Sequence, residues 1–338
     1  MQRGKILTLL SFLVGLGFTV YLLRAEGWHQ IFALLHRAGW LLLLLPLVHV
    51  VPIFLDALSW RWLLDSPGRT SRLFLTWLAL LREAVNALLP VARIGGEVLG
   101  VRLLGKSGVP IYTAASSVLV EVSLTLASQL VFTLVGLVIL LATVADRQIL
   151  HYTLWFLVAA VPAVGTVFWL QSRGRLFARF QSVLRRFLDA DQWLMRVVDL
   201  EHLDAEIQRI YSRRWALLWA NFWQLSGLFA GALEVWLTFW LLGNPIPLWS
   251  AVLLESLGQA LRSAAFFVPG GLGVQEGGFL LLGAAVGIGP DLALAFSLAR
   301  RLRELVLGVP LLGSWYIYES QRWQQRWQGQ DASREGVI

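Results

Sequence analysis

The chain has 338 residues, of which 57% are hydrophobic and only 14% are charged. Soluble domains are roughly 45–50% apolar and about 25% charged, so this composition excludes an ordinary soluble enzyme and a disordered chain; the absence of cysteine excludes a disulfide scaffold. The net charge of +7 would suit nucleic acid in a soluble protein, but beside long apolar runs it indicates arginines that set topology and meet anionic lipids. We therefore expect an all-α, polytopic integral membrane protein with no nucleic-acid partner.

The N-terminal part predicts two membrane spans. Residues 6–23 follow two basic residues and lack a small-residue cleavage site, so they are interpreted as an uncleaved first span. Residues 39–58 form the second span, in which Pro46 and Pro52 are candidate kinks. The loop of residues 61–72 is strongly basic, and the positive-inside rule places it and the N-terminus in the cytoplasm.

Further along the chain, apolar runs predict four more full spans, which gives about six in total: residues 112–144, 153–170, 215–242 and 305–318. The polar segment 173–214 is interpreted as amphipathic helices on the cytoplasmic face, with a regulatory or partner-binding domain as the alternative. The basic tail is also expected to be cytoplasmic. Glu121 and Glu234 lie inside spans, and the sequence leaves open whether Glu234 joins a polar pocket or pairs with a neighbouring arginine.

Two regions do not fit simple spans. Residues 73–110 and 250–290 carry charges within apolar sequence, broken by Pro90 and Gly95-Gly96 in the first region and by Pro269 and the following glycines in the second. The flanks of each region are assigned to one side of the membrane. Each region is therefore predicted to be a re-entrant helical hairpin.

The two odd regions also share their spacing, which predicts an internal repeat. The first copy runs Arg82, Pro90, Glu97, Pro110, Glu121, and the second runs Arg262, Pro269, Glu276, Pro290, Arg301. The intervals are 8, 7, 13 and 11 residues in the first copy and 7, 7, 14 and 11 in the second. Three predicted spans separate the copies, so the second copy is expected to be inverted, as in many transporters. The expected organisation is one transmembrane domain, 1–338, with repeat halves at about 73–144 and 250–318.

The charges inside these predicted hairpins indicate a functional site. An isolated ion at the bilayer centre costs ~2.5–3.5 kcal/mol on insertion scales, so charged residues in a membrane segment mark a substrate or ion pathway more often than a scaffold. Arg82, Arg262, Glu97 and Glu276 beside the ends of broken helices would suit a phosphate or another polar lipid head group. Glu97 or Glu276 could also carry a proton. The alternative is that the charges form buried Arg–Glu pairs that only fix the hairpins.

The residues of both hairpins resemble a known family. The segments 83–97 (EAVNALLPVARIGGE) and 268–276 (VPGGLGVQE), with the later Arg300-Arg301-Leu302-Arg303, are similar to the lysylphosphatidylglycerol synthase transmembrane (flippase-domain) family, and within it to the branch associated with hopanoid biosynthesis. The resemblance implies a bacterial inner-membrane protein that handles lipids, with substrate-binding residues in these segments. The candidates are Arg82, Glu83, Asn86, Arg93, Glu97, Arg262, Glu276, Arg301 and Glu304. Members that synthesise lysyl-lipid carry an additional aminoacyl-transfer domain, so synthase activity is not implied.

The remaining motifs do not indicate a bound nucleotide or metal. No nucleotide-binding motif is seen, and the five histidines have no metal-ligand spacing, so we expect no cofactor and no metal, and histidines that are interfacial or packed singly. The first functional hypothesis is a lipid transporter or flippase-like protein for phospholipids or hopanoids. The second is a membrane-embedded enzyme that modifies a lipid head group, with Glu97 or Glu276 as general base. The third is a scaffold that binds lipid-biosynthesis enzymes at residues 173–214. The sequence does not fix the oligomeric state.

Overall fold

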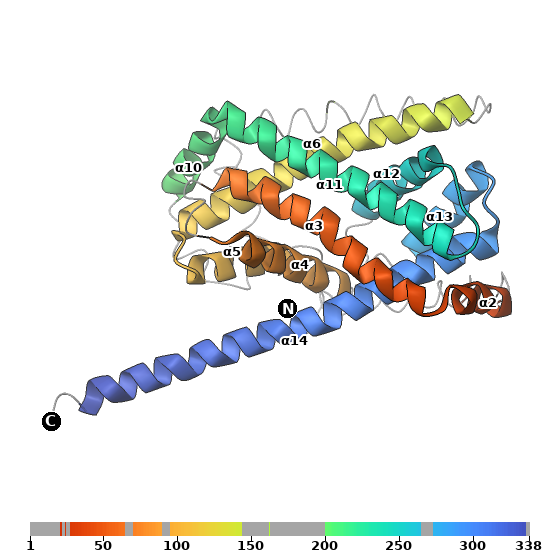
Figure 1. Ribbon diagram of the computed structural model, residues 1–338. Coiled ribbons are helices and arrows are strands. Elements are labelled where there is room, and N and C mark those ends of the chain that lie inside the picture. Colours follow the sequence, from red (N-terminus) through yellow and green to blue (C-terminus); the bar gives the residue numbers. More distant parts are fainter. Residues whose placement is uncertain are drawn as a thin grey trace.

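The computed structural model describes residues 28–64, 70–89, 95–143, 200–264 and 273–335, together with the single positions 21, 24 and 162. The described part is a bundle of helices without strands (Figure 1). Its elements are α2 (Trp28–Ala38), the 3₁₀ helix η1 (Gly39–Leu43), α3 (Leu44–Leu63), α4 (Arg72–Leu88), α5 (Gly95–Lys106), α6 (Ile111–Thr143), α10 (Leu200–Ser212), α11 (Arg214–Leu241), α12 (Leu248–Ala264), α13 (Val274–Ala285) and α14 (Pro290–Glu335).

The long helices α3 and α11 pack against each other in the middle of the bundle. In Figure 1 they run in opposite directions, and so do α6, which starts beside α10, and α14, which starts at the far end and runs back. Gly227 allows the close approach of α11 to α3, because a Cβ atom there would lie 2.6 Å from Asp56 Oδ1 and 3.2 Å from the Pro52 carbonyl oxygen. The small-residue position on α11 is therefore a packing site.

Two pairs of short helices flank this centre. α4 and α12 each have 17 residues, and α5 and α13 each have 12. Within each pair the two helices pack against each other. The first helix of each pair ends, and the second begins, inside the region where the sequence predicts an interruption: α4 ends at Leu88 and α5 begins at Gly95, while α12 ends at Ala264 and α13 begins at Val274. Proline marks the start of both following helices: Pro110 precedes α6, and Pro290 is the first residue of α14, a position where the missing N–H costs nothing.

The short pairs lie towards opposite ends of the bundle (Figure 1), and each contacts the long helix that follows the other pair. α4 packs against α14, and α12 packs against α6. Both crossings use a glycine: a Cβ on Gly308 of α14 would collide with Leu88 of α4, and one on Gly136 of α6 would collide with Ser256 of α12. The contacts thus follow the same pattern in the two halves.

Apolar side chains cover much of the outside. Two helical stretches of 33 residues, Ile31–Leu63 and Ile111–Thr143, are long and apolar enough to cross a bilayer. α11 exposes one stripe of large apolar side chains at intervals of three, four or seven residues: Trp215, Leu218, Phe222, Phe229, Leu233, Trp236 and Trp240. Such a stripe suits lipid contact, because lipid places no penalty on exposed apolar surface.

Several helix limits agree with the sequence analysis, and one does not. The spans expected at 112–144 and 215–242 correspond to α6 and α11. The last span, expected to begin at residue 305, is instead the middle of the continuous helix α14, which contains Pro310. The spans expected at 6–23 and 153–170 and most of the segment 173–214 lie outside the described residues.

The described end of the polar segment is an amphipathic helix, as predicted. α10 buries Leu203, Ile207 and Ile210, which recur at helical spacing, and it packs against α6. Its exposed side carries charged residues such as Arg209. This short helix anchors the start of α11 to the bundle.

Candidate functional site

Three arginines within about one turn of α14 reach three different neighbours. Successive residues of an α-helix point about 100° apart, so a polar run on a helix surrounded by others faces several of them. Arg300 bonds Glu255 of α12, Arg301 bonds Glu276 of α13, and Arg303 bonds Glu234 of α11. Because each charge finds an opposite charge on another helix, the polar run does not interrupt α14.

His49 of α3 lies at the centre of the largest cluster. Its Nε2 is 2.9 Å from Glu83 Oε2, and its Nδ1 is 2.7 Å from Glu234 Oε2. Nη1 of Arg303 lies 2.9 Å from the same Nδ1 and also donates to Glu234 Oε1. Four helices, α3, α4, α11 and α14, therefore meet at one imidazole.

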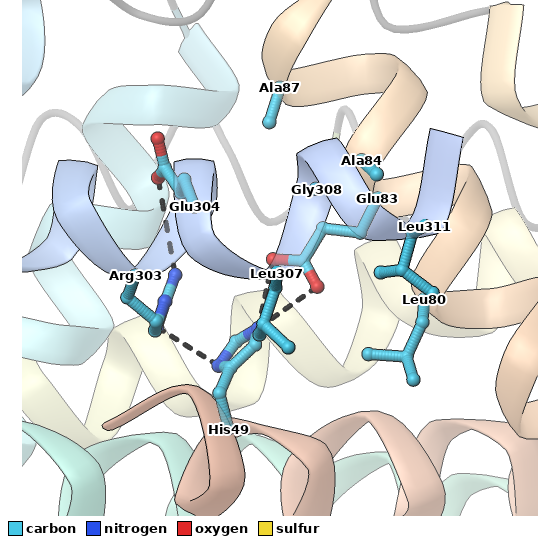
Figure 2. A pocket seen from close by; sticks show the side chains of 10 residues that line it. All are labelled: His49, Leu80, Glu83, Ala84, Ala87, Arg303, Glu304, Leu307, Gly308 and Leu311. Atoms are coloured by element: carbon cyan, nitrogen blue, oxygen red, sulfur yellow. Dashed lines mark hydrogen bonds and ion pairs between the residues drawn. The ribbon is translucent and has the colours of Figure 1, made fainter. Parts of the chain in front are cut away.

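A small, partly open hollow with a volume of about 20 Å³ lies beside this cluster (Figure 2). Its polar end carries His49, Glu83, Arg303 and Glu304, and its walls come from α4 and α14: Leu80, Ala84, Ala87, Leu307, Gly308 and Leu311. The small residues among these leave the space between the two helices. A polar end with apolar walls suits the head group of an amphiphile.

The two carboxylates of the hollow differ from its arginine in exposure. The Glu83 side chain is 37% exposed, whereas that of Arg303 is 1% exposed and is held by Glu234 and His49. Glu304 accepts from Arg301 at 3.2 Å, and its other oxygen is 4.0 Å from Arg303 Nη2. A molecule in the hollow therefore meets carboxylate oxygens first.

The first hairpin has its own cluster, centred on Arg82 of α4. Arg82 Nε donates to Glu97 Oε2 at 2.9 Å, and Nη1 is 2.7 Å from Glu121 Oε2. Asn86 accepts the Gly96 N–H at 2.9 Å, which ties α5 to α4. The Arg82 guanidinium also lies over the Trp60 ring, 4.7 Å from its centroid. One cation thus joins α4, α5 and α6 in a mainly buried position.

In the second hairpin the signs are reversed. Glu255 of α12 accepts from Arg300 and lies 3.7 Å from Arg262 Nη2, so two cations share one carboxylate. Glu276, which is fully buried, accepts the Gly273 N–H at 2.7 Å and pairs with Arg301 at 3.2 Å. Gly273 has φ of 78°, a value in the left-handed region that suits glycine.

The structure brings together part of the predicted site. Glu83, Arg301, Glu304 and Glu276 belong to one chain of contacts through α14. Arg82, Asn86 and Glu97 form the separate cluster of the first hairpin, and Arg262 contacts Glu255. Arg93 lies outside the described residues.

Three central residues were missed as site residues. The expectation that histidines pack singly is wrong for His49, which contacts two carboxylates and an arginine. Of the two roles that the sequence left open for Glu234, the structure shows the pairing with an arginine, Arg303; Glu234 is not among the residues that line the hollow. Arg303 was noted only within the family resemblance. For His49 and Glu234 the one signal available was that each is an ionisable group inside an apolar run.

No described group of three or more His, Cys, Asp or Glu side chains, within the residue ranges given above, has the arrangement of a metal site. At the His49 cluster, the Arg303 guanidinium occupies the position between His49 and Glu234 that a cation would take. The cluster is therefore an ion-pair network in which an arginine supplies the positive charge.

The fold and these clusters define a helical membrane protein with a polar site inside its bundle. The family model described as "Lysylphosphatidylglycerol synthase TM region" matches residues 8–311, and the chain belongs to this family. It is thus a membrane protein tied to lipid handling. No curated protein and no solved structure matches the chain.

Proposed function

We propose that the protein is a flippase-like lipid transporter of the bacterial inner membrane that moves polar lipids, phospholipids or hopanoids, between leaflets. The observation that carries the proposal is the matched construction of the two halves. Helices of 17 and 12 residues precede a long helix in each half. The 17-residue helix packs on the long helix of the other half, and the 12-residue helix packs on that of its own half. Alternating access works by exchanging two equivalent arrangements, whereas an enzyme needs only one asymmetric cluster.

The site supports the same function. The hollow between α4 and α14 offers polar groups at one end and apolar walls beside it, in a protein whose outer surface is apolar. A head group can bind at His49, Glu83 and Glu304 while its acyl chains remain in the bilayer. At about 20 Å³, the hollow holds about one water molecule, so a head group enters it only when α4 and α14 move apart.

The proposed topology has re-entrant hairpins that enter from opposite faces and both termini in the cytoplasm. The opposite directions of α6 and α14 in Figure 1 support it. The chain contains no cysteine, so single cysteines can be placed freely. Ser182→Cys, in the basic segment, should be labelled by an impermeant maleimide only after the membrane is opened to the cytoplasmic side. Labelling from outside would contradict this topology.

Transport can be tested in vesicles of phosphatidylethanolamine and phosphatidylglycerol that contain a trace of acyl-labelled fluorescent phosphatidylglycerol. With active protein, external dithionite should bleach nearly all of the label; with empty vesicles it should bleach about half. Glu276→Gln should remove the activity because it neutralises the buried partner of Arg301. Glu319→Gln, the same exchange outside the clusters, is the matched control. Bleaching of only half of the label by the wild-type protein would contradict the proposal.

One observation favours the second candidate, an enzyme that modifies a head group. An imidazole held by a carboxylate beside a hollow is the arrangement of a general base. Mass spectrometry of the vesicle lipids after incubation separates the two functions. A transporter leaves every lipid mass unchanged, whereas an enzyme supplied with its co-substrate produces a new mass.

A further inference from the structure

We propose that the His49 cluster is a proton site, and that the proton and the lipid head group bind there alternately, so that lipid movement is exchanged for proton movement. The inference rests on the proposed transport function. It names the energy source of that transport, which neither the family nor the fold assigns. The geometry of the imidazole and its partners carries it.

The Nδ1 atom of His49 has two partners that make opposite demands. Glu234 Oε2, at 2.7 Å, can only accept a hydrogen bond from it, and Arg303 Nη1, at 2.9 Å, can only donate one to it. A single nitrogen cannot satisfy both at once. With a proton on Nδ1 the ring donates to Glu234 Oε2, and Arg303 donates to Glu234 Oε1 instead. Nδ1 therefore keeps its proton, and Nε2, which lies beside Glu83, is the atom that takes up or gives up the second one.

The charge balance also changes with the proton. When the imidazole is neutral, the single cation Arg303 faces the two carboxylates of Glu83 and Glu234. When the imidazole is charged, the cluster is neutral, and neutrality is favoured where hydration is absent. Leaving His49 through Nε2, the proton passes to Glu83, whose side chain is 37% exposed at the hollow. From there it is released to water.

The other carboxylates near His49 are not placed to accept its proton. Glu304 of α14 lies in the hollow and pairs with Arg301, and η1 carries no ionisable residue. Glu121 of α6 is held by Arg82. On α3 itself, Asp56 lies two helical turns beyond His49, against Gly227 of α11. Of these groups, only Glu83 both contacts the imidazole and lines the hollow.

The charged imidazole and a lipid head group compete because both need the same acceptor oxygens of Glu83. The charged imidazole occupies them through Nε2–H, and a head group that donates hydrogen bonds, such as a glycerol hydroxyl, needs the same oxygens. Binding of one weakens binding of the other, and linkage makes the effect reciprocal. Proton and lipid therefore cross in opposite directions.

The experiment uses the vesicles described above with an imposed pH difference. One pH unit is worth about 1.4 kcal/mol per proton, so one-for-one exchange shifts the steady leaflet ratio of the labelled lipid by up to about tenfold. The label should accumulate in the leaflet that faces the acidic side. His49→Gln and Glu83→Gln should each abolish this shift. His36→Gln, an exposed histidine of α2, should keep it.

The outcomes separate the two proposals. If wild-type protein moves the label but the ratio ignores the pH difference, proton exchange is overturned and transport stands. Accumulation on the alkaline side would overturn competition, because proton and lipid would then move together. A shift that persists in both His49→Gln and Glu83→Gln would remove this site. If the wild-type protein moves no label at any pH, both proposals fall.

Discussion

The two halves of the bundle share a backbone plan and differ in charge. α3 to α6 and α11 to α14 follow the same order of long helix, short pair and long helix. In the first half, Arg82 serves two carboxylates, Glu97 and Glu121. In the second half, Glu255 serves two arginines, Arg262 and Arg300. The halves are alike in shape and opposite in the sign of their central group.

The difference separates the features that recur in both halves from those that do not. Helix lengths and proline positions recur because they set where the chain turns. Each buried charge needs only an oppositely charged partner close by. One arginine between two glutamates and one glutamate between two arginines therefore meet this need equally well. The His49 cluster forms where helices of both halves meet, and the described residues hold no counterpart to it.

The largest expected effect comes from removing the central cation of the first half. Arg82→Met leaves Glu97 and Glu121 without their partner in a mainly buried position. Breaking a buried pair in this way costs ~3–5 kcal/mol. The matched variant is Arg262→Met, which should cost clearly less because Glu255 keeps Arg300. Thermal unfolding in detergent compares the two; equal losses would show that the halves do not differ as described.

A smaller loss is expected from Glu276→Gln in the second half. Arg301 keeps Glu304 as a partner, and glutamine can still accept the Gly273 N–H. The expected loss is ~1.5–3 kcal/mol, that of a hydrogen bond to a charged group. The double variant Glu276→Gln, Arg301→Gln tests the role of the pair. Recovered stability without recovered lipid movement supports a transport role, whereas recovery of both would make the pair structural.

Sequence patterns predicted the local features well. α6 and α11 lie within one residue of their expected limits, because each is a long apolar run bounded by polar or proline residues. α4 ends at Leu88, two residues before the proline that predicted an interruption there, and α12 ends at Ala264, five residues before its proline. The continuity of α14 was missed, because the charged run 300–304 resembles a loop until its partners on α11, α12 and α13 are known.

The site was only half predictable for a related reason. Glu83, which lies in a segment of the family resemblance, and Glu304, another predicted substrate-binding residue, both line the hollow. His49, Glu234 and Arg303 are far apart in sequence, and their contact depends on how α3, α11 and α14 pack. Helical periodicity says which side of a helix a residue occupies, but it does not say which helix faces that side.

The contact between the halves can be tested through Gly227. A methyl group there meets Asp56 and the α3 backbone, so Gly227→Ala should cost ~1–3 kcal/mol by overpacking. Gly313→Ala is the matched control, since a Cβ there meets nothing within 4 Å. In that open helical position alanine should stabilise by ~0.5–1 kcal/mol. Unfolding curves in which both variants change in the same direction would contradict the close approach of α3 and α11.

The smallest expected effect concerns an ion pair between α5 and α14 that, among the described residues, has no counterpart between α13 and α6. Lys106, the last residue of α5, donates to Glu319 of α14 at 2.6 and 2.8 Å, and Arg102 lies 3.3 Å from the same carboxylate. The corresponding end of α13 meets α6 through apolar residues such as Leu140 and Ala285. Glu319 follows the apolar part of α14, so its pair is partly open to water.

Acid should remove the contribution of this pair. Partial burial raises the pKa of the Glu319 carboxyl, but the hydrogen bond from Lys106 and the charge of Arg102 outweigh it and hold the pKa below its usual value. A lowered pKa means that the stabilisation is present above the ordinary glutamate pKa of about 4.3 and disappears as the pH falls through the lowered value. Glu319→Gln should therefore cost ~0.2–1 kcal/mol at neutral pH, the size of a surface pair, and the difference from wild type should vanish in acid. Melting curves at several pH values measure this, and a difference that stays constant down to pH values below the lowered pKa would mean that the charge of Glu319 contributes nothing.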